Sequence, residues 1–349
     1  MKLGIVGLPQ SGKTTVFNAL AHRTEHKGTF SHKSNFAVVS VPDERLDFLW
    51  EKTGRQKNKV PATVTFVDFF AVKKESESLA LMHEMDGLLF VLRAFKLPGT
   101  DAKIEPLREA AEIEIELILS DTETVQKRLK KLEQLLTKPI PDKQEREREL
   151  HALSKVWEVL KCDNPVRTAV LTKEEEPLVR GFQLLSAKPR LLLINASEEF
   201  AGKTASEICG TEPLPDEDIL VLCGELEMEI SQLPEDDQEV FLSEYGLKER
   251  GTNALLHQSY KTLDTISFLT IGKDEVRAWT LRRGSTAQEA AGKVHTDMAR
   301  GFIRAEVVSF NDFKLLGSMK DARAHGRARL EGKEYIVADG DIIEFRFSV

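Results

Sequence analysis

The sequence predicts an α/β fold that carries an inserted antiparallel helical hairpin and ends in a small α+β domain. Three observations support this prediction. A strand, a glycine-rich loop and a helix follow one another within residues 1–20. Apolar strand-like runs then alternate with helical periodicity as far as residue 262, and short strands dominate after it. We expect a sheet domain in 1–121 and 164–262, the hairpin in 122–163 and the α+β domain in 263–349.

The composition is that of a globular cytoplasmic protein. The chain has 349 residues, of which 41% are hydrophobic and 30% charged. No apolar run approaches the ~20 residues that span a bilayer, and Met1-Lys2 leads directly into a strand, so we expect neither a membrane segment nor a secretory signal. The cysteines at 162, 209 and 223 lack metal-site spacing, which favours a reducing compartment. A net charge of −8 argues against a uniformly basic surface for nucleic acid, although a local patch remains open.

The first element is a phosphate-binding motif. Leu3–Val6 is strand-like, Gly7–Thr14 matches G-x-x-x-x-G-K-[ST], and residues 15–20 have helical spacing. Backbone amides in such a loop surround phosphate oxygens, the Lys13 ammonium reaches the β- and γ-phosphates, and the Thr14 hydroxyl ligates Mg²⁺. The expected phosphate-contacting residues are Gln10, Ser11, Gly12, Lys13, Thr14 and Thr15.

The polar stretch 24–35 is where a P-loop switch protein places a second hydroxyl on Mg²⁺. Thr29, Ser31 and Ser34 are the candidates, and we favour Ser31. An ordinary surface loop is an equal alternative for any one of them. A strand over 36–41 and a helix over 45–50 follow.

The strand-like run Val64–Asp68 ends in an acid. An aspartate at the end of a strand beside the P-loop strand suits a Walker B role, in which it holds Mg²⁺ through water, and a simple loop cap is the alternative. Switch GTPases continue Asp-x-x-Gly, but Ala71 stands at the glycine position here. Val72 stands where many of them have a water-orienting glutamine. Hydrolysis is therefore expected to be slow, to need a partner, or to position water in another way.

The next strand is expected at 87–93 and a helix at 109–121. Apolar residues then recur every three or four positions in two charge-rich segments, separated by Pro139-Ile140-Pro141. This pattern predicts an antiparallel hairpin of two amphipathic helices with solvated charged faces. The hairpin is either a plain insertion or an arm that binds a partner.

A further strand over 189–195 ends in Asn195-Ala196-Ser197-Glu198. GTPases have Asn-Lys-x-Asp at this place, where the aspartate binds guanine, so Ala196 and Glu198 put guanine recognition in doubt. An asparagine amide can both donate and accept, and could bind adenine N6 and N7 instead. A strand over 219–223 leads to Cys223-Gly224-Glu225, which would flank the base, and 227–256 is expected to be helical.

After residue 262 we expect strands at 265–271, 276–281, 303–310, 335–337 and 342–347, with a helix over 286–299. Residues 276–330 contain eleven Lys/Arg and five Asp/Glu. The side chains that could form one basic face are Arg282, Arg283, Lys293, Arg300, Arg304, Arg323, Arg327 and Arg329. Such a face suits the phosphate backbone of structured RNA. Solubilising charge is the alternative, because no aromatic stacking series accompanies it.

These residues together resemble the Obg-like ATPase family, the YchF group of the TRAFAC superfamily of P-loop proteins. The segments that carry the resemblance are Gly4–Leu20, Pro42–Leu46, Asn195–Glu198, Glu275–Thr280, Ala290–Asp297, Gly301–Ala305 and Ala338–Asp341. The resemblance extends over essentially the whole chain. Residues 292–297 and 301–305 are far more specific than a phosphate-binding loop alone.

The resemblance implies a Ras-like nucleotide domain with the hairpin inserted, and a C-terminal TGS domain of β-grasp type. It also implies hydrolysis of ATP in preference to GTP, with Asn195 and Glu198 in the base-recognition motif, and association with ribosomes and stress responses. The sequence departs from the family at Ala71, at the shortened glycine-free stretch 73–78, and at Ser31, where threonine is usual. These changes bear on hydrolysis and switching more than on binding.

We therefore expect a Mg²⁺-dependent ATPase that acts as a cytoplasmic regulatory switch. Lys13 and Asp68 are the expected catalytic residues, and Thr14, Ser31 and Asp68 the expected metal site. The expected partners are ATP, the ribosome or its RNA through the TGS domain and the hairpin, and other proteins, but no membrane. Two alternatives stay open: a nucleotide-stabilised ribosome- or RNA-binding module with negligible hydrolysis, and a GTP-specific GTPase.

Overall fold

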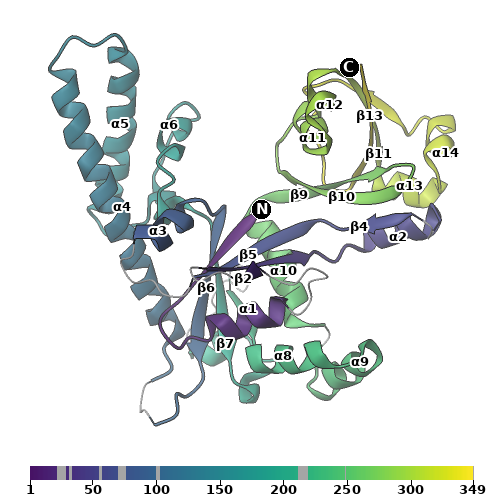
Figure 1. The fold of residues 1–349 in the computed structure, drawn as a ribbon, viewed down its shortest axis with the longest axis horizontal. Helices are drawn as coiled ribbons and strands as arrows, with labels where there is room; N and C mark the ends of the chain where they lie inside the picture. The colour runs from purple at the N-terminus through teal and green to yellow at the C-terminus, as the bar shows by residue number, and fades with distance from the viewer. Residues whose placement is uncertain are drawn as a thin grey trace. The chain divides into compact units, whose positions relative to one another are not determined.

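The computed structural model describes residues 1–21, 29–30, 34–54, 57–69, 76–99, 103–210, 219–247 and 249–348. The chain divides into two compact units. The P-loop unit contains Lys2–Ala37 and Thr65–Thr252, and the C-terminal unit contains Met1, Val38–Val64 and Asn253–Val349. Figure 1 shows strands and helices in both units. The predicted α/β class is confirmed, and the predicted domain boundaries stay a prediction.

The first sheet has seven strands in the order β2-β3-β5-β1-β6-β7-β8. Their bounds are β1 Lys2–Val6, β2 Thr29–Phe30, β3 Ser34–Ser40, β5 Thr63–Phe69, β6 Gly87–Ala94, β7 Arg190–Ala196 and β8 Ile219–Leu222. β1 pairs in parallel with β5 and β6, and the parallel pairing continues through β7 to β8. The carboxyl ends of these five strands therefore share one edge, which is where sheets of this kind bind ligands.

Helices bury the apolar side chains of this sheet. α1, Lys13–Ala21, buries Val16, Phe17 and Leu20. α3, Ser76–His83, precedes β6, all eight residues of which are buried. A strand such as β6, apolar except for Arg93, is typical of a parallel sheet covered on both faces, so the sequence pattern and the packing agree.

The predicted helical hairpin is confirmed, but its first helix begins earlier in the chain than expected. α4, Pro106–Leu136, and α5, Lys143–Leu160, run side by side in Figure 1. Glu149 on α5 accepts hydrogen bonds from Arg128 Nε at 2.6 Å and from Arg146 Nη1 at 2.9 Å. The separate helices expected at 109–121 and after 122 are one helix of 31 residues, because the apolar stripe continues through the junction without a helix-breaking residue.

Short elements complete the unit after the hairpin. They are η1 Val166–Thr168, α6 Glu176–Arg180, η2 Leu185–Ala187, η3 Glu198–Phe200, α7 Ala205–Cys209, α8 Gly224–Gln232 and α9 Glu235–Glu244, and α10 Gly251–Thr262 leads into the C-terminal unit. The prediction of one helix over 227–256 is wrong. Pro234, which has no N–H to donate, separates α8 from α9. Gly246, with φ of 66°, follows the end of α9.

The sheet of the C-terminal unit has six strands in the order β12-β11-β13-β9-β10-β4. Their bounds are β4 Asn58–Val60, β9 Thr265–Ile271, β10 Glu275–Arg282, β11 Phe302–Ser309, β12 Arg329–Glu331 and β13 Asp341–Phe347. The edge strand β4 comes from the first part of the chain and pairs in parallel with β10. The prediction of a strand over 335–337 is wrong, because Ile336 makes only an isolated bridge with Thr286.

Two apolar clusters pack against this sheet. One contains residues of α11, Ala287–Val294, together with Phe268 and Val307. One helix is expected over 286–299, but the structure has two. α11 ends at Val294, and the short helix α12, Thr296–Arg300, begins after His295. The other cluster contains Leu46 and Leu49 from α2, Glu44–Lys52, and residues of α13, Phe310–Leu316, and α14, Met319–Ala324. Residues 38–64 thus complete a core whose other members follow residue 253.

Arg45 links this early segment to the end of the chain through two carboxylates. Its Nη2 donates to Asp43 Oδ2 and its Nη1 to Asp339 Oδ2, both at 2.8 Å. These bonds raise the pKa of Arg45, and the bond to Asp43 has the largest effect. Asp339 Oδ1 also accepts from the backbone N of Ser267 at 2.8 Å. The motifs 42–46 and 338–341 therefore meet inside the C-terminal unit.

Among the helices of the described residues, none combines the length and apolar character that crossing a bilayer requires.

Candidate functional site

The loop between β1 and α1 has no room for a side chain at its two glycines. A Cβ at Gly7 would lie 2.5 Å from the carbonyl oxygen of Val91, and one at Gly12 would lie 2.1 Å from Asn195 Nδ2. Gly12 has φ of 84° and Gln10 has φ of 63°, both left-handed. The chain therefore turns sharply before α1, and the unpaired amides at the start of that helix lie at the ligand-binding edge of the sheet.

The Lys13 side chain lies against this loop. Its Nζ donates to the carbonyl oxygens of Gly7 at 3.0 Å and Leu8 at 2.8 Å. Burial lowers the pKa of Lys13, and the negative charges of Asp68 and Glu109 oppose that shift. The ammonium group predicted from the motif is thus at the loop that would surround the phosphates.

Asp68 lies next to the start of α1. It is paired in register with Ile5 and is only 2% exposed. Thr14 Oγ1 donates to Asp68 Oδ2 at 3.3 Å, whereas Asp68 Oδ1 is buried without a partner in the part of the chain that the structure describes. Burial raises the pKa of Asp68, and the Thr14 bond and the Lys13 charge counteract this. An orphaned carboxylate oxygen beside a hydroxyl is the donor set that Mg²⁺ prefers, so these residues fit that ion.

The Asn195 side chain fastens two loops together. Its Nδ2 donates to the carbonyl oxygen of Ser11 at 3.1 Å, and its Oδ1 accepts from the backbone N of Gly224 at 3.0 Å. A Cβ at Gly224 would lie 3.3 Å from Thr15 Cγ2, so this loop closely approaches α1. Asn195 Nδ2 has a second N–H to donate and Oδ1 has a second lone pair to accept with. The side chain could therefore still contact a base while it positions the loops.

The other residues expected around the base follow β7 and β8. Glu198 begins η3 and is exposed, and Glu225 is exposed in the first turn of α8. Cys223 precedes α8 and is nearly buried, and burial raises the pKa of its thiol. Ser31, Ala71 and Val72 lie outside the described residues, so the roles suggested for them stay predictions.

Sequence reasoning missed a buried ion pair that lies close enough to act on Lys13. Glu109 Oε2 on α4 accepts from the backbone N of Arg93 at 2.9 Å, and Glu109 Oε1 is 3.3 Å from Arg93 Nη2. Burial raises the pKa of Glu109, and the bonds from Arg93 oppose it. Nothing in the sequence distinguishes Glu109 from the many other glutamates of an amphipathic helix.

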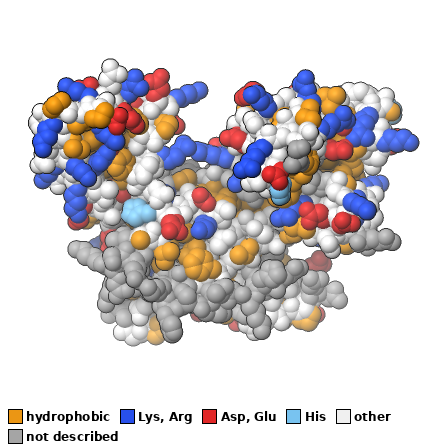
Figure 2. Space-filling model, turned by 45° about the horizontal axis from the view of Figure 1, so that its top comes forward, with side chains coloured by type: hydrophobic (Ala, Val, Ile, Leu, Met, Phe, Trp, Pro, Cys, Tyr) orange, Lys and Arg blue, Asp and Glu red, His pale blue; other side chains and the backbone are white. Residues whose placement is uncertain are grey.

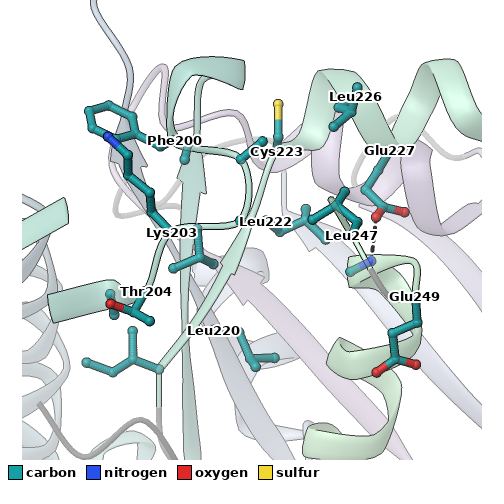
Figure 3. A pocket seen from close by; sticks show the side chains of 17 residues that line it. Phe200, Lys203, Thr204, Leu220, Leu222, Cys223, Leu226, Glu227, Leu247 and Glu249 are labelled. Atoms are coloured by element: carbon teal, nitrogen blue, oxygen red, sulfur yellow. Dashed lines mark hydrogen bonds between the residues drawn. The ribbon is translucent and has the colours of Figure 1, made fainter. Parts of the chain in front are cut away.

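A cavity of about 350 Å³ lies at the edge of β8. Figure 3 shows the side chains of Leu220, Leu222 and Leu247 around it. Glu227 is already engaged, since its Oε1 accepts from the backbone N of Gly251 at 2.5 Å and its Oε2 from Thr252 Oγ1 at 3.0 Å. Because Lys13, Thr14 and Asp68 do not line it, this cavity is not the phosphate site.

The predicted basic face is partly neutralised. Four of its eight members form ion pairs: Arg283 with Asp264, Arg323 with Glu306 and Glu344, Arg327 with Asp312, and Arg329 with Glu331. Within the described ranges, Arg282, Lys293, Arg300 and Arg304 have no ion pair. On the face that Figure 2 shows, Lys and Arg side chains are interspersed with Asp and Glu side chains. An RNA-binding role for this unit therefore stays a prediction.

Comparison with known proteins gives consistent matches. Residues 265–348 match the family model YchF-GTPase_C, described as a protein of unknown function (DUF933). The chain is 35% identical over 365 residues to the ribosome-binding ATPase YchF of Bacillus subtilis, covering 99% of each chain. It is 34% identical over 367 residues to the protein of the same name from Haemophilus influenzae, covering 100% of this chain and 99% of that one. The solved YchF GTPase of Schizosaccharomyces pombe superposes with a TM-score of 0.84 at 26% identity, covering 99% of this chain and 97% of that one.

Proposed function

Because this chain belongs to the YchF family and is a P-loop NTPase, we propose that it binds and hydrolyses ATP with Mg²⁺ and acts at the ribosome. The observation that carries the proposal is the arrangement at the start of α1. Lys13 lies on the phosphate-binding loop, and Thr14 donates to one oxygen of Asp68, whose other oxygen has no partner among the described residues.

The proposed mechanism assigns each group a separate task. Thr14 and Asp68 would hold Mg²⁺, which when bound neutralises charge on the β- and γ-phosphates. Lys13 stabilises the charge that develops on the transferring phosphoryl group. Asn195 keeps the P-loop and the loop before α8 in a fixed relation, so that the phosphates and the base are bound together. No side chain is assigned as general base.

Adenine in preference to guanine is proposed from the base-recognition segment. Asn195-Ala196-Ser197-Glu198 lacks the lysine and the aspartate of the guanine motif, and Glu198, at the beginning of η3, is exposed. Competition between ATP and GTP for the protein tests this directly. Equal affinity for the two nucleotides, or a preference for GTP, would contradict it.

Action at the ribosome is proposed from the relatives, whose names describe ribosome-binding ATPases. The C-terminal unit and the α4–α5 hairpin are the surfaces we propose for this contact, and a regulatory switch is the role we propose for it. Co-sedimentation with ribosomes, with and without ATP, tests the contact. Single-turnover hydrolysis with and without ribosomes separates a switch from a nucleotide-stabilised binding module that barely hydrolyses.

The test of the nucleotide site is Lys13→Ala. We expect ATP affinity to fall by about 10- to 150-fold, because hydrogen bonds to charged groups contribute about 1.5–3 kcal/mol. Lys188→Ala is a matched control. Lys188 Nζ also donates to two carbonyl oxygens, those of His83 at 2.8 Å and Met85 at 2.5 Å, and burial also lowers its pKa. Unchanged ATP affinity in Lys13→Ala, measured by calorimetry, would refute the site.

A further inference from the structure

In the described part of the chain, few buried polar side-chain atoms lack a hydrogen-bond partner. Among the described residues they are Ser11 Oγ, Asn35 Oδ1, Asp68 Oδ1 and Asn253 Oδ1. Leaving such a group unpaired destabilises the fold, so each calls for an explanation. The Asp68 oxygen is explained by the proposed metal site. Asn35, which is 5% exposed, has no role in that site so far.

The strand pairing places Asn35 next to Asp68. β3 and β5 are neighbours in the sheet, and the backbone N of Val41, just after β3, donates to Ala62 O, just before β5, at 2.8 Å. The end of one strand thus meets the beginning of the other, so the two are antiparallel. Counting back from this bond pairs Ser40 with Thr63 and Asn35 with Asp68.

The burial pattern supports the same register independently. In β3 the buried residues alternate, at Asn35, Ala37 and Val39. In β5 the residues that this register sets opposite them, Asp68, Phe66 and Val64, are buried as well. Side chains directly opposite on one face have Cβ atoms about 4.5–5.5 Å apart. Two oxygens that have no partner among the described residues, one from an amide and one from a carboxylate, therefore belong to residues opposite each other on adjacent strands. The other oxygen of that carboxylate accepts from Thr14 Oγ1.

We propose that Asn35 is a further magnesium-positioning residue, whose Oδ1 joins Thr14 and Asp68 in holding the hydrated ion. Mg²⁺ keeps several of its waters when it binds to proteins, and those waters donate hydrogen bonds to nearby oxygens. A buried amide oxygen and a buried carboxylate oxygen on adjacent strands suit that task, because neither accepts a hydrogen bond from the part of the protein that the structure describes. This inference rests on the proposed Mg²⁺–ATP site.

The test replaces the amide with an apolar side chain of similar size, Asn35→Leu. The affinity for adenylyl-imidodiphosphate is measured by calorimetry in EDTA and in excess Mg²⁺, and Mg²⁺ affinity is obtained by titrating the complex. We expect about 10- to 100-fold weaker Mg²⁺ binding, as is common when an outer-shell partner is lost, with nucleotide affinity in EDTA unchanged. Asn253→Leu is the control, because it removes the other amide oxygen that is buried without a partner among the described residues, and Asn253 belongs to the C-terminal unit.

The outcomes separate the two proposals. If Asn35→Leu responds to Mg²⁺ as the wild type does, Asn35 has only a structural role and this inference is wrong. If the wild type binds no nucleotide, or binds it without any response to Mg²⁺, the proposed function fails instead.

A second measurement does not depend on the variant folding. In wild-type protein labelled with ¹⁵N-asparagine, the Asn35 side-chain amide signal should shift when Mg²⁺ is added to the nucleotide complex, and the Asn253 signal should not. An Asn35 signal that stays in place would overturn the inference.

Discussion

The assignment of residues 38–64 to the C-terminal unit makes Leu49→Ala a revealing substitution. Leu49 lies on α2, is 0% exposed, and shares an apolar cluster with residues that follow position 253. Removing a buried leucine side chain in this way costs about 2–5 kcal/mol. At about 1.4 kcal/mol per factor of ten, the opening equilibrium of the C-terminal unit should rise about 30- to 4,000-fold.

Native-state hydrogen exchange measures this opening strand by strand. In Leu49→Ala we expect faster exchange in β9 and β13, which follow it by more than 200 residues, and little change in β1 and β6. Leu20→Ala is the matched control, because Leu20 is also a fully buried leucine on a nine-residue helix, α1. Leu20→Ala should accelerate hydrogen exchange in β1 and β6 instead. If Leu49→Ala accelerated β1 and β6 as much as β9 and β13, the assignment of 38–64 to the C-terminal unit would be refuted.

Two further predictions concern other contacts. Asn195→Ala removes two hydrogen bonds worth about 0.5–1.5 kcal/mol each, so ATP affinity should fall about 5- to 150-fold in calorimetric titration. An unaltered affinity would mean that Asn195 does not position the loops. Glu306 is 3% exposed and accepts hydrogen bonds from Arg323 and Arg346. These bonds lower the pKa of Glu306, and those from Arg323 have the largest effect. Because the pKa of Glu306 is lowered in the folded state, its ionised carboxylate stabilises the fold at pH values above the ordinary pKa of about 4.5. That stabilisation is lost as the pH falls below this value. Chemical unfolding across that range should show this loss for the wild type and a smaller one for Glu306→Gln.

Much of the fold could be predicted because its signals are local. The P-loop strand, loop and helix are contiguous, and the hairpin repeats apolar residues over many turns. The strands β9 and β10 follow the expected ranges closely for the same reason. In contrast, β4 is only three residues long, and two of its residues are exposed. It becomes a strand by pairing with β10, and a local pattern of three residues contains no information about that partner.

The candidate site divides in the same way. Lys13, Thr14 and Asp68 were predicted because a motif or a strand end marks them. The sequence does not single out Asn35, because an asparagine at the beginning of a strand resembles a loop residue, and the role proposed for it depends on the residue opposite. Glu109 was missed because its neighbour in space, Arg93, lies in β6 rather than on its own helix. Both omissions are contacts between elements, which spacing along the chain does not record.

Because α4 is one continuous helix, a rotation at its beginning is transmitted to the tip of the hairpin. Ala110, Ile113 and Leu117 near its beginning pack into the core of the sheet, and Val125 and Leu132 pack against α5. At 1.5 Å per residue, its 31 residues form a rod about 46 Å long. A tilt of roughly 10° at the base would carry the tip through about 8 Å. Glu109 lies at that base and is bonded to the end of β6, so a small displacement there would be magnified at the far end of the arm.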